Sequence, residues 1–282
     1  MGNQPLISVV LPVRDGAQVV TRAVESICGQ TLRDWELVVV DDGSRDGTAE
    51  MLARLAQRDP RVRVVTQGRE GIVAALNAGI AVARGELIAR MDADDVAMPE
   101  RLAAQAEFLR ENRDVGVVSC LVEFGGDRAA SAGYALHVDW INSLVTPEEI
   151  MRNRFVEAPL AHPSAMFRRD LVARLGGYRA GDFPEDYELW LRWMEAGVRI
   201  AKVPRELLRW NDGAERISRT DTRYGAEAFF RVKAEWLARE LQRIAVGREI
   251  WVWGAGRPTR KRAAHLENYG ITISGYIDAH GD

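Results

Sequence analysis

The chain has 282 residues, of which 47% are hydrophobic and 28% are charged, and its formal net charge is −3. This length supports one large α/β domain, or a domain and a half, with a sizeable core, and the composition is ordinary for a globular protein. No basic stripe is interleaved with aromatic residues, so nucleic acid is excluded as an expected partner.

Two features of the sequence bear on its compartment. Cys28 and Cys120 lie in apolar segments without metal-type spacing, which favours buried free thiols and a reducing environment. The N-terminus lacks the regions of a signal peptide, and no uncharged apolar run approaches the roughly 18 residues of a spanning helix. We therefore expect a cytoplasmic protein with at most peripheral contact at the inner face of the membrane; an oligomer is compatible with the sequence.

From residue 7 onward, strand and helix patterns alternate with short connections, which is typical of a mostly parallel sheet covered by helices. Apolar runs predict buried strands at 7–11, 36–40, 62–65, 87–89 and 115–122. Apolar residues at helical spacing predict helices over 20–28, 48–56 and 72–83. Pro99 is expected in the first turn of a further helix.

The alternation weakens in the second half of the chain. Residues 125–145 are rich in Gly and Ala, and we expect a mobile acceptor loop there. Thr146-Pro-Glu-Glu149 predicts a capping box at a helix start. Helices are also predicted over 185–194, with an acidic start, and over about 223–246.

Polar residues follow four of the predicted strands at the point where each strand ends. They are Pro12–Gly16, Asp41–Gly47, Gln67–Gly71 and Asp92–Asp95. Because ligands bind outside the carboxyl ends of parallel strands, we expect these segments to form one site. Asp42 can accept from the imide N–H of a uracil, and Arg14 or Arg69 can meet phosphates. The alternative for Asp41–Gly47 is a turn that only caps the next helix.

Asp92, Asp94 and Asp95 end a short apolar run. Unit charges about 4 Å apart repel by roughly 4 kcal/mol at the effective dielectric near a protein surface, so such a group requires solvation or a cation. Carboxylate oxygens favour Mg²⁺ or Mn²⁺, which commonly bridge carboxylates and a substrate's phosphates. The alternative is an acidic turn before a helix.

Together these motifs resemble a family 2, inverting-type glycosyltransferase with the GT-A fold, which uses a nucleotide-diphospho-sugar. The resemblance covers about residues 6 to 220 and is carried by Ile7–Gly16, Val39–Thr48, Gly71–Gly79, Ala83–Glu86, Met91–Asp95, Gly176–Tyr178 and Glu185–Trp190. The ordered set is much stronger evidence than any single motif. It implies an α/β fold with a mixed, Rossmann-like sheet and helices on both faces.

The resemblance also implies roles for individual residues. Asp42 is similar to the carboxylate that contacts the base, and Pro12 to the position whose backbone faces it. Asp92 and Asp94 match the Asp-x-Asp pair, with Asp94 as the direct metal ligand and Asp92 nearer the ribose or a metal-bound water. The expected nucleotide-sugar site comprises Pro12, Arg14, Asp15, Asp42, Arg69, Gly71, Asn77, Asp92 and Ala93.

The same resemblance assigns the catalytic carboxylates. Asp186 matches the general base, and Glu185 is its acidic neighbour; the alternative for Asp186 is an N-cap of the following helix. His162 is a candidate to complete the shell of a Mn²⁺ or Mg²⁺ held by Asp94 and Asp92, or to touch the diphosphate. The alternative is an ordinary packed or hydrogen-bonded histidine. Asn77 either touches the nucleotide or is solvated.

The pattern and the resemblance divide the chain into three parts. Residues 1–220 are the expected GT-A domain, with a nucleotide-sugar half (1–122) and an acceptor half (123–220). Residues 221–247 form a helical extension. Residues 248–282 resemble the opening strand-helix-strand of a Rossmann unit, but Thr259 replaces the third glycine of the dinucleotide fingerprint. We expect this partial unit to be truncated.

We expect a hexosyl- or hexosaminyl-type glycosyltransferase that uses Mn²⁺ or Mg²⁺ and a nucleotide-sugar donor, with uridine as the expected base. The acceptor would be a glycan or lipid-linked hydroxyl in cell-surface polysaccharide or lipopolysaccharide assembly. One base and one metal suffice for inversion, and no nucleophile for a retaining mechanism is identifiable. The rival functions are a noncatalytic nucleotide-sugar-binding or scaffold protein and a dinucleotide-dependent oxidoreductase that uses the C-terminal unit.

Overall fold

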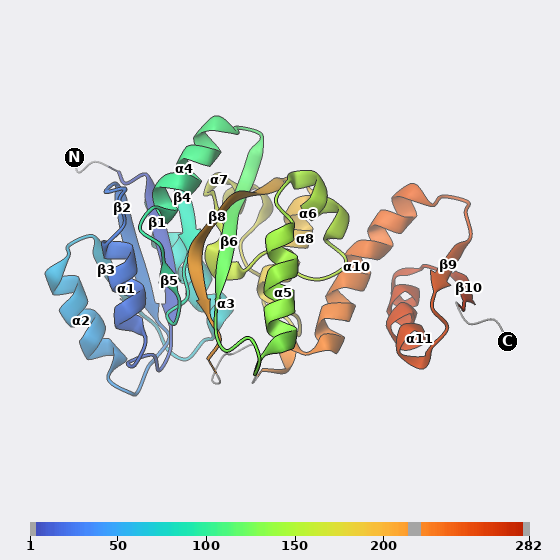
Figure 1. Ribbon diagram of the computed structural model, residues 1–282, viewed down its shortest axis with the longest axis horizontal. Helices are drawn as coiled ribbons and strands as arrows, with labels where there is room; N and C mark the ends of the chain where they lie inside the picture. Colours follow the sequence, from blue (N-terminus) through green and yellow to red (C-terminus); the bar gives the residue numbers. More distant parts are fainter. Residues whose placement is uncertain (1–3, 214–220, 279–282) are drawn as a thin grey trace.

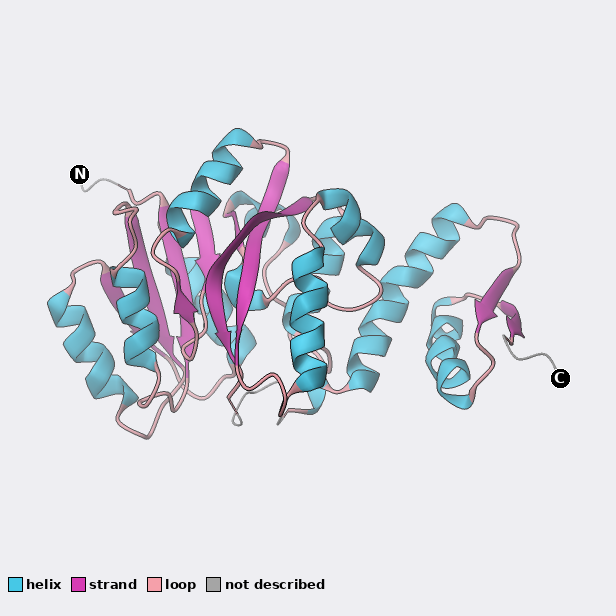
Figure 2. Ribbon diagram, viewed as in Figure 1, coloured by secondary structure: helices cyan, strands magenta, loops and turns pink. Residues whose placement is uncertain are grey.

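The computed structural model describes residues 4–213 and 221–278 (Figure 1). Its centre is an eight-stranded mixed sheet with helices on both faces, and a separate two-stranded sheet lies beyond the long helix α10 (Ala226–Ile244) (Figure 2). The α/β class with a mixed sheet, expected from the sequence, is confirmed. The expected domain boundary at residue 220 lies outside the described residues.

The first four strands and their helices follow the sequence pattern closely. The strands are β1 (Ile7–Val13), β2 (Trp35–Asp41), β3 (Val62–Thr66) and β4 (Leu87–Arg90). The helices are α1 (Val20–Cys28), α2 (Thr48–Arg58) and α3 (Ile72–Val82). All four strands are parallel, in the order β3-β2-β1-β4, so their carboxyl ends meet at one edge of the sheet.

Strand β1 separates two hydrophobic cores. Ile7, Val9 and Leu11 lie in the core that is closed by α1, α2 and the later helices α4 and α5, whereas Val10 lies in the core on the other face, with α3. This is the alternation expected of a strand with both faces covered. A Cβ on Gly79 would lie 2.6 Å from Val10 Cγ1, so α3 packs directly against β1.

The second half of the chain completes the sheet in mixed orientation. Its strands are β5 (Val96–Ala97), β6 (Val115–Gly125), β7 (Met166–Arg168) and β8 (Arg199–Asn211). Its helices are α4 (Arg101–Glu111), α5 (Ala132–Ser143), α6 (Pro147–Asn153), the 3-10 turn η1 (His162–Ser164), α7 (Asp170–Leu175) and α8 (Glu185–Glu195). Strand β7 runs antiparallel between β4 and β6, while β8 is parallel to β6 and antiparallel to β5.

Several details of this half test the sequence expectations. The mobile loop expected over 125–145 is wrong for residues 132–143, which form α5 because Ala135, Val138 and Ile141 share one buried face. The capping box at Thr146 is confirmed. Helix α4 begins two residues after Pro99, with Glu100 as its N-cap.

The C-terminal elements after α10 form a small unit that packs on this helix. They are β9 (Ile250–Trp253), α11 (Arg257–Ala263), η3 (Ala264–Tyr269) and β10 (Ile273–Ile277), with β9 and β10 parallel. The 3-10 turn η2 (Thr222–Tyr224) precedes α10. Leu266 and Ile271 pack on Ala234 and Ala238 of α10. Within residues 4–213 and 221–278, no helix is both long and apolar enough to cross a membrane.

Candidate functional site

A cavity of about 1020 Å³ opens where β1, β2 and β4 end. Its lining includes every residue expected to bind the nucleotide-sugar except Arg69 and Asn77, and it also includes Asp94. The remaining lining residues are Val13, Gly16, Gln18, Val19, Asp46, Ile72, Ala75, Gly213, Asp221, Thr222 and Arg223. The strand-end segments that lie far apart in the sequence therefore meet around one space.

Hydrogen bonds join the loop after β1 to the loop after β2. Gly16 N donates to Thr48 Oγ1 at 2.9 Å, Ala17 N to Asp46 Oδ2 at 2.9 Å and Arg45 N to Asp15 Oδ1 at 2.8 Å. Asp15 has a φ of 52°, a left-handed conformation that a non-glycine residue adopts at an energetic cost. These contacts hold that conformation. Asp46 also accepts from Thr48 N at 3.1 Å, whereas the N-cap of α2 is Gly47.

Asp42 is a fixed acceptor at this edge of the sheet. Its Oδ1 accepts from Glu70 N at 2.8 Å and from Gln67 Nε2 at 2.8 Å, and its Oδ2 accepts from Gly71 N at 3.0 Å. The guanidinium of Arg14 lies 3.5 Å from Oδ2. Asp42 is therefore held by the loop after β3 while it lines the cavity.

The two expected nucleotide residues outside the lining have other partners. Arg69 forms an ion pair with Asp15 at 2.5 Å, in which both side chains are substantially exposed. Asn77 Nδ2 donates to Tyr178 O at 2.9 Å, and Asn77 Oδ1 accepts from Tyr178 N at 3.1 Å. Asn77 thus fixes the segment before α8 to α3, a contact between residues 101 positions apart.

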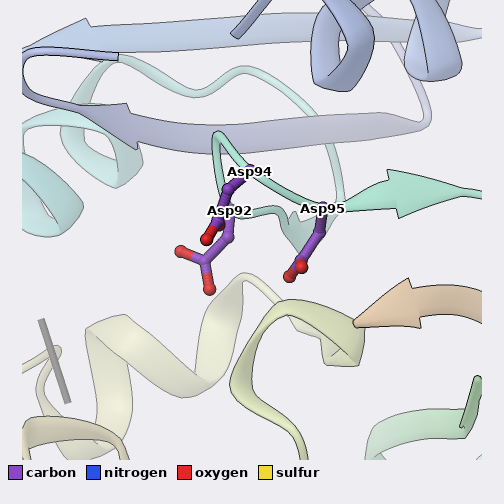
Figure 3. Close-up of side chains that lie close together, drawn as sticks. All are labelled: Asp92, Asp94 and Asp95. Carbon is purple, nitrogen blue, oxygen red and sulfur yellow. The ribbon is translucent and has the colours of Figure 1, made fainter. Parts of the chain in front are cut away.

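Asp92, Asp94 and Asp95 place carboxylate oxygens within 4.8 Å of one another. In Figure 3 the carboxylates of Asp92 and Asp94 lie next to each other, and that of Asp95 lies on the other side of the turn. Asp92 and Asp94 line the cavity, whereas Asp95 is buried and accepts from Asn211 N at 2.8 Å. Clustered carboxylate oxygens at a cavity fit a divalent cation such as Mn²⁺ or Mg²⁺.

A buried arginine and histidine lie behind this group. The Arg90 guanidinium bonds to Asp92; burial lowers the pKa of Arg90, but the negative charges of Asp92 and nearby groups outweigh it and leave that pKa above its usual value. His162 Nε2 lies 2.7 Å from Tyr178 Oη. Burial and then the charge of Arg90 hold the pKa of His162 well below its usual value, so its imidazole is neutral. His162 is not part of the carboxylate group found among the described residues.

Glu185 and Asp186 open α8, where Glu185 is buried and Asp186 is half-buried. The N-cap is Pro184, so Asp186 is not the N-cap; its Oδ1 accepts from Tyr187 N at 2.8 Å. Burial, followed by the charge of Glu185, raises the pKa of Asp186 to about 7. Glu185 is buried, which raises its pKa, and it accepts a hydrogen bond from Tyr224 Oη at 2.6 Å. An aspartate that titrates near neutral pH can serve as a general base.

The segment after residue 220 contributes residues that sequence reasoning missed. Asp221, Thr222 and Arg223 line the cavity, and Asp221 Oδ2 accepts from Arg223 Nη2 at 2.7 Å. The sequence interpretation assigned this segment to a helical extension. The available signal was the polar run Asp221-Thr-Arg-Tyr224 just before Gly225, which breaks the helical pattern ahead of α10.

Sequence comparisons identify relatives of this chain. The model of glycosyl transferase family 2 matches residues 8–176. The O-antigen biosynthesis glycosyltransferase WbnJ from Escherichia coli is 29% identical over 249 residues, which cover 86% of this chain and 91% of WbnJ. The amylovoran biosynthesis glycosyltransferase AmsE from Erwinia amylovora is 30% identical over 203 residues, which cover 70% of this chain and 72% of AmsE.

Solved structures share the fold. The mannosyltransferase PcManGT from Pyrobaculum calidifontis, in complex with GDP-Man and Mn²⁺, superposes with a TM-score of 0.60 at 24% identity and covers 95% of this chain and 70% of that protein. S. aureus TarS 1-349 in complex with UDP-GlcNAc gives a TM-score of 0.64 at 17% identity and covers 93% of this chain and 71% of that one. At these identities the likeness shows the fold, which is the expected GT-A fold.

Proposed function

Because the chain belongs to glycosyl transferase family 2, we propose that it transfers a sugar from a nucleotide-diphospho-sugar to a hydroxyl group of a glycan or lipid-linked acceptor. The observation that carries the proposal is the cavity in which Asp42, Asp92 and Asp94 meet. Arg223 lines this cavity, and the next residue, Tyr224, donates a hydrogen bond to Glu185, the neighbour of Asp186.

We propose a UDP-sugar as the donor. The Asp42 carboxylate is fixed at the cavity, and a carboxylate can accept from the imide N–H of a uracil. Arg14 lies beside Asp42 and faces the same cavity, where its guanidinium can meet a phosphate. The names of WbnJ and AmsE refer to O-antigen and amylovoran biosynthesis, which supports a glycan acceptor in surface polysaccharide assembly.

We assign the metal site to Asp94 and Asp92, because both line the cavity and belong to one group of carboxylates. A divalent cation held there would neutralise the negative charge that develops on the departing diphosphate. Arg90 binds Asp92 from the buried side and so fixes the direction of that carboxylate. His162 is expected to remain bonded to Tyr178.

Asp186 acts as the general base for the acceptor hydroxyl. In its ionised form it takes the proton of the acceptor hydroxyl as that oxygen attacks the anomeric carbon, and a single displacement of this kind inverts the configuration. Glu185 is engaged by Tyr224, which favours a role as neighbour of the base over a role as nucleophile. The stereochemistry of the product, read by NMR, tests the single displacement.

The decisive experiment is a thermal-shift screen of UDP- and GDP-sugars with and without Mn²⁺, followed by a turnover assay of each hit. A ligand that binds the native state at about 100 times its Kd stabilises it by about 2.7 kcal/mol. We expect a UDP-sugar to raise the melting temperature only when Mn²⁺ is present, and to be transferred or slowly hydrolysed. Binding without any turnover would instead indicate a noncatalytic nucleotide-sugar-binding protein.

A further inference from the structure

The hydroxyl of Tyr224 lies at the buried carboxylate next to Asp186. Glu185 is 3% exposed, and its Oε2 accepts from Tyr224 Oη at 2.6 Å. We propose that Tyr224 is a positioning residue for the reacting carboxylates: its hydroxyl fixes Glu185 as an ionised neighbour of Asp186, so that the proton held by the pair resides on Asp186. This inference rests on the proposed role of Asp186 as the base.

Burial leaves the pKa of Glu185 raised, but three neighbouring groups favour its charged form. A buried carboxylate without hydrogen bonds is strongly unfavourable, and the hydroxyl of Tyr224 provides one. The distance of 2.6 Å lies in the range of hydrogen bonds between a hydroxyl and an ionised oxygen. The positive charges of Arg90 on β4 and Arg223 on η2 act in the same direction, against the burial that raises the pKa of Glu185.

Among the described residues the donors to Asp186 are backbone N–H groups, its own and that of Tyr187, and not a side chain. Its Oδ1 accepts from Tyr187 N, at 2.8 Å, in its own helix. The charged and titratable groups around it come from β4, α8, η2 and the segment before α8, and are Arg90, Glu185, Tyr187, Tyr224 and Tyr178. Of the two carboxylates, Asp186 is therefore the better place for a proton.

With the charge on Glu185 and the proton on Asp186, Asp186 is a stronger base than an ordinary aspartate. Burial and then the charge of Glu185 raise the pKa of Asp186 to about 7, partly offset by Arg90. A base whose pKa lies near the working pH combines a useful ionised fraction with a strong affinity for the acceptor's proton. The base strength of Asp186 thus depends on the charge of Glu185, which Tyr224 maintains.

Removing the hydroxyl of Tyr224 should move the proton of the pair from Asp186 to Glu185. In Tyr224→Phe, Glu185 loses a hydrogen bond that favours its charged form and becomes the protonated member of the pair. Asp186 then lies beside a neutral neighbour, and its titration should move toward acid by about one pH unit or more, as expected for the loss of a nearby like charge. The acid limb of the pH–rate profile should move in the same direction, with a lower plateau.

Two measurements test this on the full chain. Carbon-13 NMR follows the Asp186 carboxyl through a pH titration, with its signal assigned by its loss in Asp186→Asn, and the pH–rate profile follows turnover of the UDP-sugar found in the screen. The matched control is Tyr187→Phe, which also removes a tyrosine hydroxyl, one that donates to the Arg154 carbonyl at 2.6 Å. The control should leave the Asp186 titration unchanged.

An Asp186 titration that stays in place or moves toward alkali in Tyr224→Phe would overturn the inference, even if the variant is less active. If that variant does not fold, Glu185→Gln provides the same neutral neighbour and should give the same acid shift; an unshifted titration there also overturns it. The NMR titration needs no turnover. A protein that shows the acid shift but transfers no sugar therefore supports the pairing and contradicts the proposed function.

Discussion

The two acidic groups of the site have the same chemistry and different surroundings. Asp92 and Asp94 are partly exposed and face the cavity, whereas Glu185 is buried and the pKa of Asp186 is raised to about 7 by burial and by Glu185. Clustered carboxylates at a cavity favour a cation, while a buried pair favours a proton. The difference teaches that desolvation and a neighbouring charge, more than residue type, divide metal binding from proton transfer.

The fold accounts for the difference in burial. Asp92 and Asp94 lie in the turn after β4, at the edge of the sheet where the strand-end loops meet. Glu185 and Asp186 start a helix whose Trp190 and Trp193 are fully buried in the second core, so the helix start is drawn against the protein interior.

The largest expected effect concerns Asp94, in the acidic group that faces the cavity. Asp94→Asn removes one carboxylate charge from the proposed metal site, so we expect Mn²⁺-dependent UDP binding to be lost and transfer to fall by roughly 10³-fold or more, since a metal contributes several kcal/mol at the transition state. Calorimetry and a transfer assay measure the two effects. Asp95→Asn is the matched control, because Asp95 is buried and holds Asn211 N. Equal losses in both variants would contradict the assignment.

A change at Asp186 should lower the rate of transfer without weakening the binding of the donor. Asp186→Asn keeps the size of the side chain but cannot accept the hydroxyl proton, so we expect kcat to fall by about 10²- to 10⁴-fold. The affinity for the UDP-sugar and Mn²⁺ should stay within about twofold, which calorimetry can check. Asp182→Asn, an exposed carboxylate shortly before α8, serves as the control and should leave kcat unchanged. Loss of UDP-sugar binding in Asp186→Asn would contradict the assignment of Asp186 to proton transfer alone.

The buried group should also affect stability in a pH-dependent way. The pKa of Asp186 is raised from 3.8 to about 7, so the unfolded chain loses this proton first, and the stability contributed by the neutral carboxyl is lost as the pH rises toward 7. Asp186→Asn stays neutral throughout. We therefore expect the variant to be more stable than the natural chain by about 1–3 kcal/mol at pH 8, and by little at pH 4. Urea unfolding at both values measures this, and an advantage confined to acid pH would refute it.

The sequence located one acidic group more completely than the other. Asp42, Asp92 and Asp94 follow buried strands directly, and because strand ends meet at one edge, local pattern was enough to bring them together. The mostly parallel sheet covered by helices followed from the same periodicity, and its mixed character from the family resemblance. The aspartate cluster and its surroundings were thus within reach of sequence reasoning.

The environment of Asp186 was not predictable in this way. Its pKa depends on desolvation by the surrounding chain and on the charge of Glu185. Glu185 in turn accepts from Tyr224, which is 39 positions away. Helix α5 was missed because Gly and Ala resemble a loop until Ala135, Val138 and Ile141 find the core. The partners of Asn77 lie 101 positions away. Such contacts are set by tertiary packing, on which local propensity has little influence.

The smallest expected effect on activity concerns Tyr178, which interacts with the charges of Asp186, Glu185 and Asp92. Asn77 holds the backbone of Tyr178 by two hydrogen bonds. Asn77→Ala leaves those backbone groups without these partners, so we expect a loss of about 1–3 kcal/mol in the free energy of unfolding.

Because Asn77 is not among the residues that line the cavity, the affinity of Asn77→Ala for the UDP-sugar should change by less than about threefold. Urea unfolding and donor calorimetry on the same variant give both values. A stable variant with weakened donor binding would restore Asn77 to the nucleotide site, as the family resemblance implies. Lower stability with unchanged donor affinity would show that Asn77 acts by holding the backbone of Tyr178 and not by binding the nucleotide.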